Sequence, residues 1–368
     1  ILTGEAAVKH IPAVIKGFDA KRIFIIADHT MVAVGLVNNI EKELIKCGIK
    51  YMIYSDLIPE PTIAIAQQAI EALKEFHADF IIGIGGGSAL DIAKVASVIS
   101  RNNGAIKDYL NLSGTRKLEE KGLPKILIPT TSGTGSEVTD IAVFSLDDTK
   151  DVISHEFLLA DVAIVDPELT YTLSPKVTAS SGIDALTHAV EALVSIYSSP
   201  LTDTLALESI RKISSNIRNA VWQGSFESRR EMAWGSLMAG LSFYNAGVSG
   251  VHALAYPLGG LYKIPHGESN AVMLTYVFDY IWPSCIDKMN LIAHSLGIQT
   301  KYKNKREIAI EAVRELKNIV SDVGIPLTLD KFGVKEQDIE LLAQKAIKQK
   351  RLLRRSPKPY NLEAVKEI

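Results

Sequence analysis

Residues 79–100 read DFIIGIGGGSALDIAKVASVIS, a short apolar run that leads through a glycine-rich turn into a helical pattern. Residues 79–83 predict a buried strand, and the helix is expected from Ala89. Between them, the glycines let backbone N–H groups approach a pyrophosphate, with the positive end of the helix behind them. The fingerprint is imperfect, because Ser88 takes the place of the last glycine in GxGxxG, and such a turn also serves simple chain reversal. The stretch predicts an α/β domain and a candidate dinucleotide site.

The segments around this stretch alternate between short β-branched runs and helical periodicity. The expected strands are 22–28, 50–55, 79–83, 125–131 and 162–165, and the expected helices between the first three are 31–47 and 62–77. Successive strand–helix–strand units imply parallel pairing with right-handed crossovers. We therefore predict an N-terminal, doubly wound, Rossmann-like parallel sheet.

From about residue 167 the pattern becomes helical. The expected helices are 178–196, 201–221, 228–245, 252–258, 266–281, 305–323, 336–350 and 362–368. A chain of 368 residues also exceeds the size at which one hydrophobic core usually stops growing. We expect two domains, an α/β dinucleotide-binding domain in 1–170 and an all-α, metal-binding and catalytic domain in 171–368.

Four side chains of the second half are candidate metal ligands. Asp184 and His188 stand at i and i+4, on one face of a helix, and His252 and His266 frame a segment of small, apolar and turn-forming residues. Three imidazole nitrogens and one carboxylate suit zinc or ferrous iron better than magnesium or calcium. Taken singly, each histidine could instead be a core or capping residue.

Several motifs carry a family resemblance. The segments GIDALTHAVEA (182–192), HALAYPLGG (252–260), PHG (265–267), GGGS (85–88) and PTTSGTGSE (129–137) resemble those of the iron-containing, metal-dependent alcohol dehydrogenases. The resemblance implies the dehydroquinate synthase-like architecture of that family. It also implies NAD(H) as cofactor and one divalent ion, Fe²⁺ or Zn²⁺, held by Asp184, His188, His252 and His266.

The same resemblance implies a set of cofactor-binding residues. Gly85, Gly86, Gly87 and Ser88 would contact the diphosphate, Thr130, Thr131 and Thr134 would line the adenine, ribose and nicotinamide, and Lys150 would approach a phosphate. Asp28 would accept hydrogen bonds from the adenosine ribose and repel a 2′-phosphate, which favours NAD over NADP. Residues 132–140 could instead form a polar turn capped at Thr139, and Asp28 could merely cap the next helix.

Two positions bear on proton transfer and substrate. The family often has a further histidine four residues after the third ligand, and here that position is Tyr256, a weaker proton relay near neutral pH. The HALAYPLGG and PHGES segments resemble a subgroup that includes 4-hydroxybutyrate dehydrogenases and reductases of anionic short aldehydes. The expected substrate is a small primary alcohol and its aldehyde, such as 4-hydroxybutyrate and succinic semialdehyde, or sulfoacetaldehyde. Lys263 could pair with the acid group of such a substrate or could be a solvated loop residue.

Other functions stay open. One is a dehydrogenase of glycerol or diols, including lactaldehyde and 1,3-propanediol substrates; another is a non-catalytic nucleotide- or metal-binding protein. Enzymes of this architecture that act on phosphorylated substrates need several fixed cations near the metal, and only Lys263 qualifies around the candidate ligands.

The composition gives no indication of a nucleic-acid or membrane partner. The formal net charge of −2 gives no global attraction to nucleic acid or anionic membrane, and no apolar run reaches the roughly 20 residues of a membrane span. The two cysteines, Cys47 and Cys285, are far apart in the sequence, so they indicate neither a disulfide framework nor a thiolate zinc site. This cysteine content fits a protein of the reducing cytoplasm. A homodimer or higher homo-oligomer is expected from the family resemblance.

Overall fold

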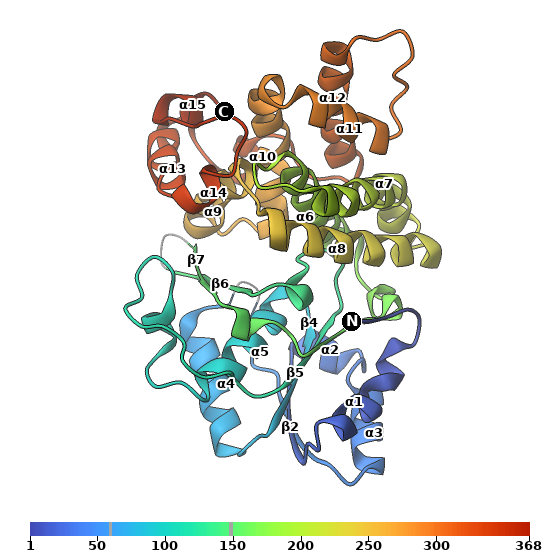
Figure 1. Cartoon of the computed structure of the whole chain (residues 1–368), viewed down its shortest axis with the longest axis vertical. Coiled ribbons are helices and arrows are strands. Elements are labelled where there is room, and N and C mark those ends of the chain that lie inside the picture. Colours follow the sequence, from blue (N-terminus) through green and yellow to red (C-terminus); the bar gives the residue numbers. More distant parts are fainter. Residues whose placement is uncertain (59–60, 147–149) are drawn as a thin grey trace. The chain divides into compact units, whose positions relative to one another are not determined.

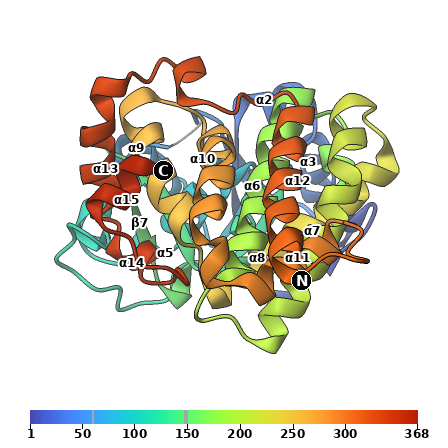
Figure 2. The ribbon, with the colours of Figure 1, turned by 90° about the horizontal axis from the view of Figure 1, so that it is seen from above.

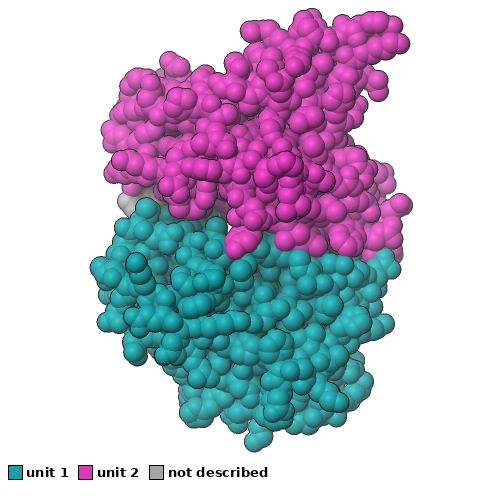
Figure 3. All heavy atoms as spheres, viewed as in Figure 1, with its two compact units in different colours: residues 1–131, 135–146, 150–170 teal, residues 132–134, 147–149, 171–368 magenta. Residues whose placement is uncertain are grey.

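The computed structural model describes residues 1–58, 61–146 and 150–368, which form two compact units (Figure 3). The first unit comprises 1–131, 135–146 and 150–170. The second comprises 171–368 together with the short segment 132–134. A piece of the loop that follows one strand of the first unit therefore packs within the second.

The first unit contains a six-stranded parallel sheet with the strand order β1-β8-β5-β4-β2-β3, flanked by helices (Figure 1). Its strands are β1 (Leu2–Thr3), β2 (Arg22–Ala27), β3 (Lys50–Tyr54), β4 (Phe80–Gly85), β5 (Lys125–Pro129) and β8 (Val162–Val165). Its helices are α1 (Ile11–Gly17), α2 (His29–Ala33), α3 (Asn38–Lys46), α4 (Ile63–Glu75) and α5 (Gly87–Ile99). The predicted doubly wound parallel sheet is confirmed.

The two faces of the sheet follow from the alternation of side chains along each strand. In β2, Ile23 and Ile25 belong to the core cluster that includes residues of α1 and α3. Phe24 and Ile26 belong to the cluster on the opposite face, which includes residues of α4 and α5. Because both faces are covered, the strands read as continuous apolar runs, the pattern typical of buried parallel strands.

Local predictions in this unit were wrong at three places. The single helix expected over 31–47 is split into α2 and α3, because Gly35 adopts a left-handed conformation (φ 75°) that ends the first piece. Helix α1 was not predicted. Neither was the antiparallel pair of β6 (Ile141–Ser145) and β7 (Lys150–Ser154).

The second unit is helical, as predicted. Its helices are α6 (Pro175–Val194), α7 (Pro200–Trp222), α8 (Phe226–Ala246), α9 (Gly250–Tyr262), α10 (His266–Ile281), α11 (Ile286–Ser295), α12 (Lys305–Asp322), α13 (Ile339–Ala346), α14 (Lys350–Leu353) and α15 (Leu362–Glu367). Helix α10 lies between α9 on one side and α6 and α12 on the other (Figure 2). None of the helices in the described ranges is long and apolar enough to cross a membrane.

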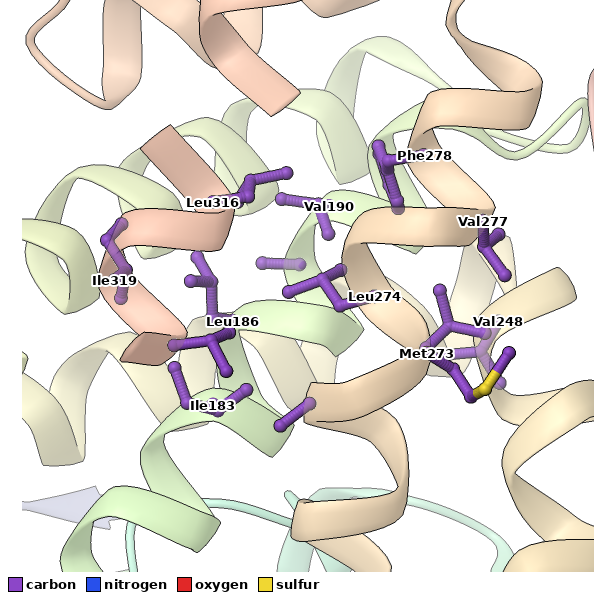
Figure 4. Close-up of a cluster of buried hydrophobic side chains, with 14 of the residues drawn as sticks. Ile183, Leu186, Val190, Val248, Met273, Leu274, Val277, Phe278, Leu316 and Ile319 are labelled. Carbon is purple, nitrogen blue, oxygen red and sulfur yellow. The ribbon is translucent and has the colours of Figure 1, made fainter. Parts of the chain in front are cut away.

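A continuous apolar core joins these helices. Figure 4 shows Leu186 and Val190 of α6 beside Leu274 of α10 and Leu316 of α12, all buried. Burial of a side chain of this size stabilises the fold by about 1.5–3 kcal/mol relative to exposure. Helices α6 and α10 are therefore fixed to each other by packing.

Three helical predictions of this unit need correction. Helix α11 was missed, and the helix expected over 252–258 extends at both ends to become α9, with Pro257 inside it. The single helix expected over 336–350 is broken, because α13 ends at Ala346 and α14 begins only at Lys350. Periodicity located the apolar faces but not the points where tertiary packing bends the chain.

The first unit also buries a cluster of charged side chains behind its loops. Asp91 of α5 accepts hydrogen bonds from the Ser136 hydroxyl (2.6 Å) and the Val143 N–H (2.9 Å), and Lys94 donates to the Ile141 carbonyl (2.8 Å). The carboxylate of Glu137 is 3% exposed, and its Oε2 has no hydrogen-bond partner within the described residues. Burial raises the pKa of Glu137 to about 7, although its own backbone N–H and Lys94 act in the opposite direction.

This raised pKa predicts a pH-dependent stability difference. Between pH 4.5 and 7 the unfolded chain ionises at Glu137 while the folded chain keeps the proton, so stability is lost as the pH rises. Glu137→Gln removes that loss, which amounts to roughly 3 kcal/mol above pH 7. Urea unfolding of both proteins at pH 5 and pH 8 should show the variant gaining more at pH 8. An equal difference at the two pH values would contradict the prediction.

Candidate metal and dinucleotide sites

Helix α6 carries the first two candidate metal ligands. The helix begins after Ser174, whose hydroxyl accepts a hydrogen bond from the Val177 N–H, with Pro175 in its first turn. Asp184 and His188 lie one turn apart in the middle of the helix and are 2% and 5% exposed. Burying a carboxylate and an imidazole costs free energy unless hydrogen bonds or a cation replace the lost water. The two side chains therefore need polar partners inside the protein.

Helices α9 and α10 bring the other two ligands to the same place. His252 lies in the first turn of α9, and His266 is the first residue of α10. Gly267 follows His266, and a Cβ at this glycine would lie 2.2 Å from the Ser180 carbonyl oxygen of α6. The absence of a side chain thus lets the start of α10 approach α6 closely enough to set His266 beside Asp184.

Three of the four candidate ligands converge in the structure. Oδ1 of Asp184 lies 3.9 Å from Nε2 of His188, 3.9 Å from Nε2 of His252 and 3.7 Å from Nε2 of His266. The ligand atoms of Asp184, His252 and His266 are all within 4.8 Å of one another, and His188 lies outside this group of three. Tetrahedral coordination with bonds of about 2.0–2.2 Å places ligand atoms roughly 3.4 Å apart. The group of three fits a divalent ion after the side chains close in on it, and His188 needs the larger adjustment to join them.

The other ring nitrogens of two histidines have acceptors. Nδ1 of His188 lies 3.3 Å from the Gly133 carbonyl, and Nδ1 of His252 lies 2.6 Å from Oε2 of Glu191. Each Nδ1 therefore carries the proton, which leaves the Nε2 lone pair for a metal. Burial lowers the pKa of His188 to about 4 against the opposing effect of Asp184, so its imidazole is neutral at physiological pH, as a ligand must be.

Three residues of this site were missed by the sequence analysis. Asn270 is fully buried, and its Nδ2 donates to Asp184 Oδ1 (2.7 Å) and lies 3.1 Å and 3.3 Å from Nε2 of His252 and His266. Glu191 supports His252 as described above. The ring of Phe243 stacks on His188 with centroids 4.2 Å apart and forms an apolar wall.

Helical spacing could have identified two of the three. Glu191 stands three residues after His188, and Asn270 stands four residues after His266, so each shares a helix face with a ligand. Phe243 lies in another helix, and only tertiary packing brings it to His188. The Gly133 carbonyl gives no side-chain signal at all.

The candidate dinucleotide residues of the first unit gather at one edge of its sheet. Asp28, Gly85 and Thr130 follow or end β2, β4 and β5, which are neighbours in the sheet. The Thr130 N–H donates to the Gly85 carbonyl (2.9 Å), and a Cβ at Gly86 would lie 3.7 Å from the Thr131 methyl. The two loops are therefore in contact at the carboxyl edge, where α/β sheets bind nucleotides.

The glycine-rich turn has the backbone geometry that this role needs. Gly85 has a φ of 150°, and Gly86 is the extended N-cap of α5. Gly87 and Ser88 form the first turn of α5, and both are partly exposed. Free N–H groups at a helix start can bind a phosphate.

The remaining candidates lie in different settings. Asp28 does cap α2, because its carboxylate accepts from the Met31 N–H (3.0 Å), and its Oδ2 also lies against Gly85. Lys150 is the first residue of β7 and is 4% exposed. Thr134 belongs to the segment 132–134 of the second unit.

Tyr256 and Lys263 differ sharply in exposure. Tyr256 is 6% exposed, one turn after His252 in α9, and its ring centroid lies 6.2 Å from that of His266. Lys263 is exposed and ends α9 in a left-handed conformation with a φ of 56°. Tyr256 is thus near the ligand set, whereas Lys263 lies at the solvent-facing end of the helix.

Known proteins agree with this arrangement. Two protein-family models match the chain. The family model described as "Iron-containing alcohol dehydrogenase" matches residues 1–167, and the one described as "Fe-containing alcohol dehydrogenase family, C-terminal" matches residues 178–368. Long-chain-alcohol dehydrogenase 1 of Geobacillus thermodenitrificans is 52% identical over 362 residues, which cover 98% of this chain and 91% of that protein.

Solved structures give the same result. The crystal structure of 1,3-propanediol oxidoreductase has a TM-score of 0.95 at 32% identity and covers 100% of this chain and 96% of that one. Sulfoacetaldehyde reductase from Bifidobacterium kashiwanohense, in complex with NAD⁺, has a TM-score of 0.88 at 27% identity, with 99% and 94% covered. The chain belongs to the iron-containing alcohol dehydrogenase family and is an NAD- and metal-dependent enzyme that interconverts alcohols and aldehydes.

Proposed function

We propose that Asp184, His188, His252 and His266 hold the catalytic divalent ion and that the substrate oxygen binds beside it. The observation that carries the proposal is the convergence of Asp184, His252 and His266, with His188 Nε2 3.9 Å from Asp184 Oδ1. When bound, the metal acts as a Lewis acid that stabilises negative charge on the substrate oxygen during hydride transfer to or from NAD(H). The choice between Fe²⁺ and Zn²⁺ depends on metal supply.

The cofactor residues take the roles that the resemblance implies. The turn between β4 and α5, from Gly85 to Ser88, faces the diphosphate. Thr130, Thr131 and Thr134 line the adenine, ribose and nicotinamide, with Lys150 near a phosphate. The contact between the Gly85 and Thr130 loops supports one continuous nucleotide surface. Asp28 retains an oxygen that does not cap α2 and can accept from the ribose, which favours NAD over NADP.

Tyr256 is our candidate for the proton route, directly or through water and the ribose hydroxyls. Its position one turn after His252 and its burial support a role beside the substrate. The Arg355 guanidinium interacts electrostatically with the Tyr256 phenol.

For the substrate, we propose a small primary alcohol and its aldehyde, with an anionic member such as succinic semialdehyde or sulfoacetaldehyde as the first candidate. A relative that reduces sulfoacetaldehyde supports the anionic class. The apolar wall of Phe243 and the relatives named for long-chain alcohols and 1,3-propanediol support the neutral alternative.

We also propose that the division of labour follows residues 1–170 for the dinucleotide and 171–368 for the metal and catalysis. A homodimer or higher homo-oligomer in the cytoplasm completes the proposal. The free Cys47 and Cys285 are compatible with a reducing compartment. Light scattering on the purified chain measures the assembly directly.

The metal-ligand assignment predicts the behaviour of His266→Ala. The variant loses one of four ligands and should bind far less Zn²⁺ or Fe²⁺ after dialysis, with kcat/KM reduced by about 10³-fold or more, because charge stabilisation by the metal contributes several kcal/mol. His294→Ala changes an exposed histidine of α11 and is the matched control. Metal analysis that finds equal metal in both variants would remove His266 from the site.

The proton-route assignment predicts that Tyr256→Phe slows turnover while metal content is unchanged. The ring and its packing remain, and only the hydroxyl is lost, so kcat should fall by about 10²-fold. Steady-state rates from pH 6 to 10 test this. A pH–rate profile that coincides with that of the wild type would rule out the Tyr256 role.

The substrate proposal predicts a ranking of aldehydes. NADH consumption by protein reloaded with Fe²⁺ or Zn²⁺ should be faster with succinic semialdehyde and sulfoacetaldehyde than with acetaldehyde, propanal, lactaldehyde or glyceraldehyde. If Lys263 contacts the acid group, Lys263→Ala should raise KM for the anionic aldehydes alone. Faster turnover of neutral aldehydes, unaffected by Lys263→Ala, would make the enzyme a general alcohol dehydrogenase.

A further inference from the structure

Glu191 of α6 is a fully buried carboxylate surrounded by hydrogen-bond donors. Its Oε1 accepts from the Val251 N–H (2.7 Å) and the Ser249 hydroxyl (3.1 Å), and its Oε2 accepts from Nδ1 of His252 (2.6 Å). Among the described residues, His252 is the titratable side chain that hydrogen-bonds to Glu191. A fully buried carboxylate is destabilising unless hydrogen-bond donors surround it. These three hydrogen bonds therefore hold the Glu191 side chain in place against His252.

We propose that Glu191 is a positioning residue for the metal, because it holds the Nδ1 proton of His252 and thereby aims the Nε2 lone pair at the ion. A neutral imidazole has one N–H and one lone pair, so a proton fixed on Nδ1 leaves the lone pair on Nε2. That Nε2 lies 3.9 Å from Asp184 Oδ1, on the ligand side of the ring. A carboxylate at the opposite nitrogen also raises the basicity of a ligating histidine.

His188 provides an internal comparison. Its Nδ1 has a neutral acceptor, the Gly133 carbonyl at 3.3 Å, whereas His252 has a charged acceptor at 2.6 Å. Charge-assisted hydrogen bonds are shorter and about twice as strong as neutral ones. His252 is therefore the more firmly oriented of these two ligands, and the difference comes from Glu191.

Glu191 also has a structural role that must be separated from this one. Ser249 and Val251 lie at the start of α9, so Oε1 satisfies donors at the helix N-terminus. A cap of this kind stabilises the fold without changing the affinity for metal. The two roles use different oxygens of the same carboxylate, which allows two variants to distinguish them.

The decisive pair is Glu191→Gln and Ser249→Ala in the full chain. Glu191→Gln preserves volume but removes the charge and one acceptor, whereas Ser249→Ala removes only one hydrogen bond to Oε1. The Kd for Zn²⁺ is measured by competition with a chromogenic chelator, together with the Tm of each metal-free protein. Glu191→Gln should raise the Kd by about 10–100-fold, and Ser249→Ala should leave it near the wild-type value. No rise in Glu191→Gln, or equal rises in both variants, would overturn the proposal.

A second measurement does not depend on how the variants fold. In ¹⁵N-labelled, Zn²⁺-loaded wild-type protein, the Nδ1 proton of His252 should give a low-field, exchange-protected imidazole signal, because it is buried in a short hydrogen bond to a carboxylate. A freely exchanging proton on Nδ1 would contradict the assignment.

The inference rests on His252 being a metal ligand, as proposed above. If His266→Ala retains the metal, the ligand set itself is wrong. If His266→Ala loses the metal but Glu191→Gln binds Zn²⁺ as tightly as the wild type, only the role of Glu191 is wrong.

Discussion

The carboxylate of Asp184 is 2% exposed, and its need for compensation organises the helical unit. A buried, uncompensated carboxylate costs several kcal/mol, so donors or a cation must lie beside it. Here an amide N–H of Asn270 and the edges of three imidazoles provide the polar surroundings, drawn from three helices. A divalent ion among Asp184, His252 and His266 would neutralise the charge and engage the lone pairs of these two histidines.

The candidate ligands lie on helices, and the apolar core fixes those helices to one another. Leu186 and Val190 of α6 pack with Leu274 of α10, on the turns next to the ligands, and Gly267 permits the close approach of the two backbones. Ligands on packed helices keep their geometry better than ligands on loops. The same helix that supplies Asp184 and His188 supplies Glu191, so one element holds ligands and support in a single rigid frame.

The dinucleotide residues depend on a different constraint, the carboxyl edge of a parallel sheet. Neighbouring strands β2, β4 and β5 end side by side, so the residues that follow them meet whatever their separation in sequence. The chain after β5 then enters the helical unit at 132–134, where the Gly133 carbonyl accepts from His188. The segment after β5 thus supplies the acceptor for the ring of His188, a candidate ligand.

The sequence by itself determined the features that repeat at short range. Continuous apolar runs and helical periodicity predicted the parallel sheet and the helical second half, and the spacing of Asp184 and His188 predicted a shared helix face. The family motifs identified His252, His266 and the glycine-rich turn. The periods of helices and strands follow from local backbone geometry. The apolar patterns and the residue spacing can therefore be recognised in the sequence without knowledge of the packing.

Only the tertiary structure decided which distant groups meet. The contact of Asn270 with Asp184 spans 86 residues, and that of Gly133 with His188 spans 55. The stacking of Phe243 on His188 likewise joins helices that no local pattern links. Such contacts depend on how whole helices and strands pack, a balance of many small burial terms that no short stretch of sequence contains. The split at Gly35, by contrast, follows from the glycine itself.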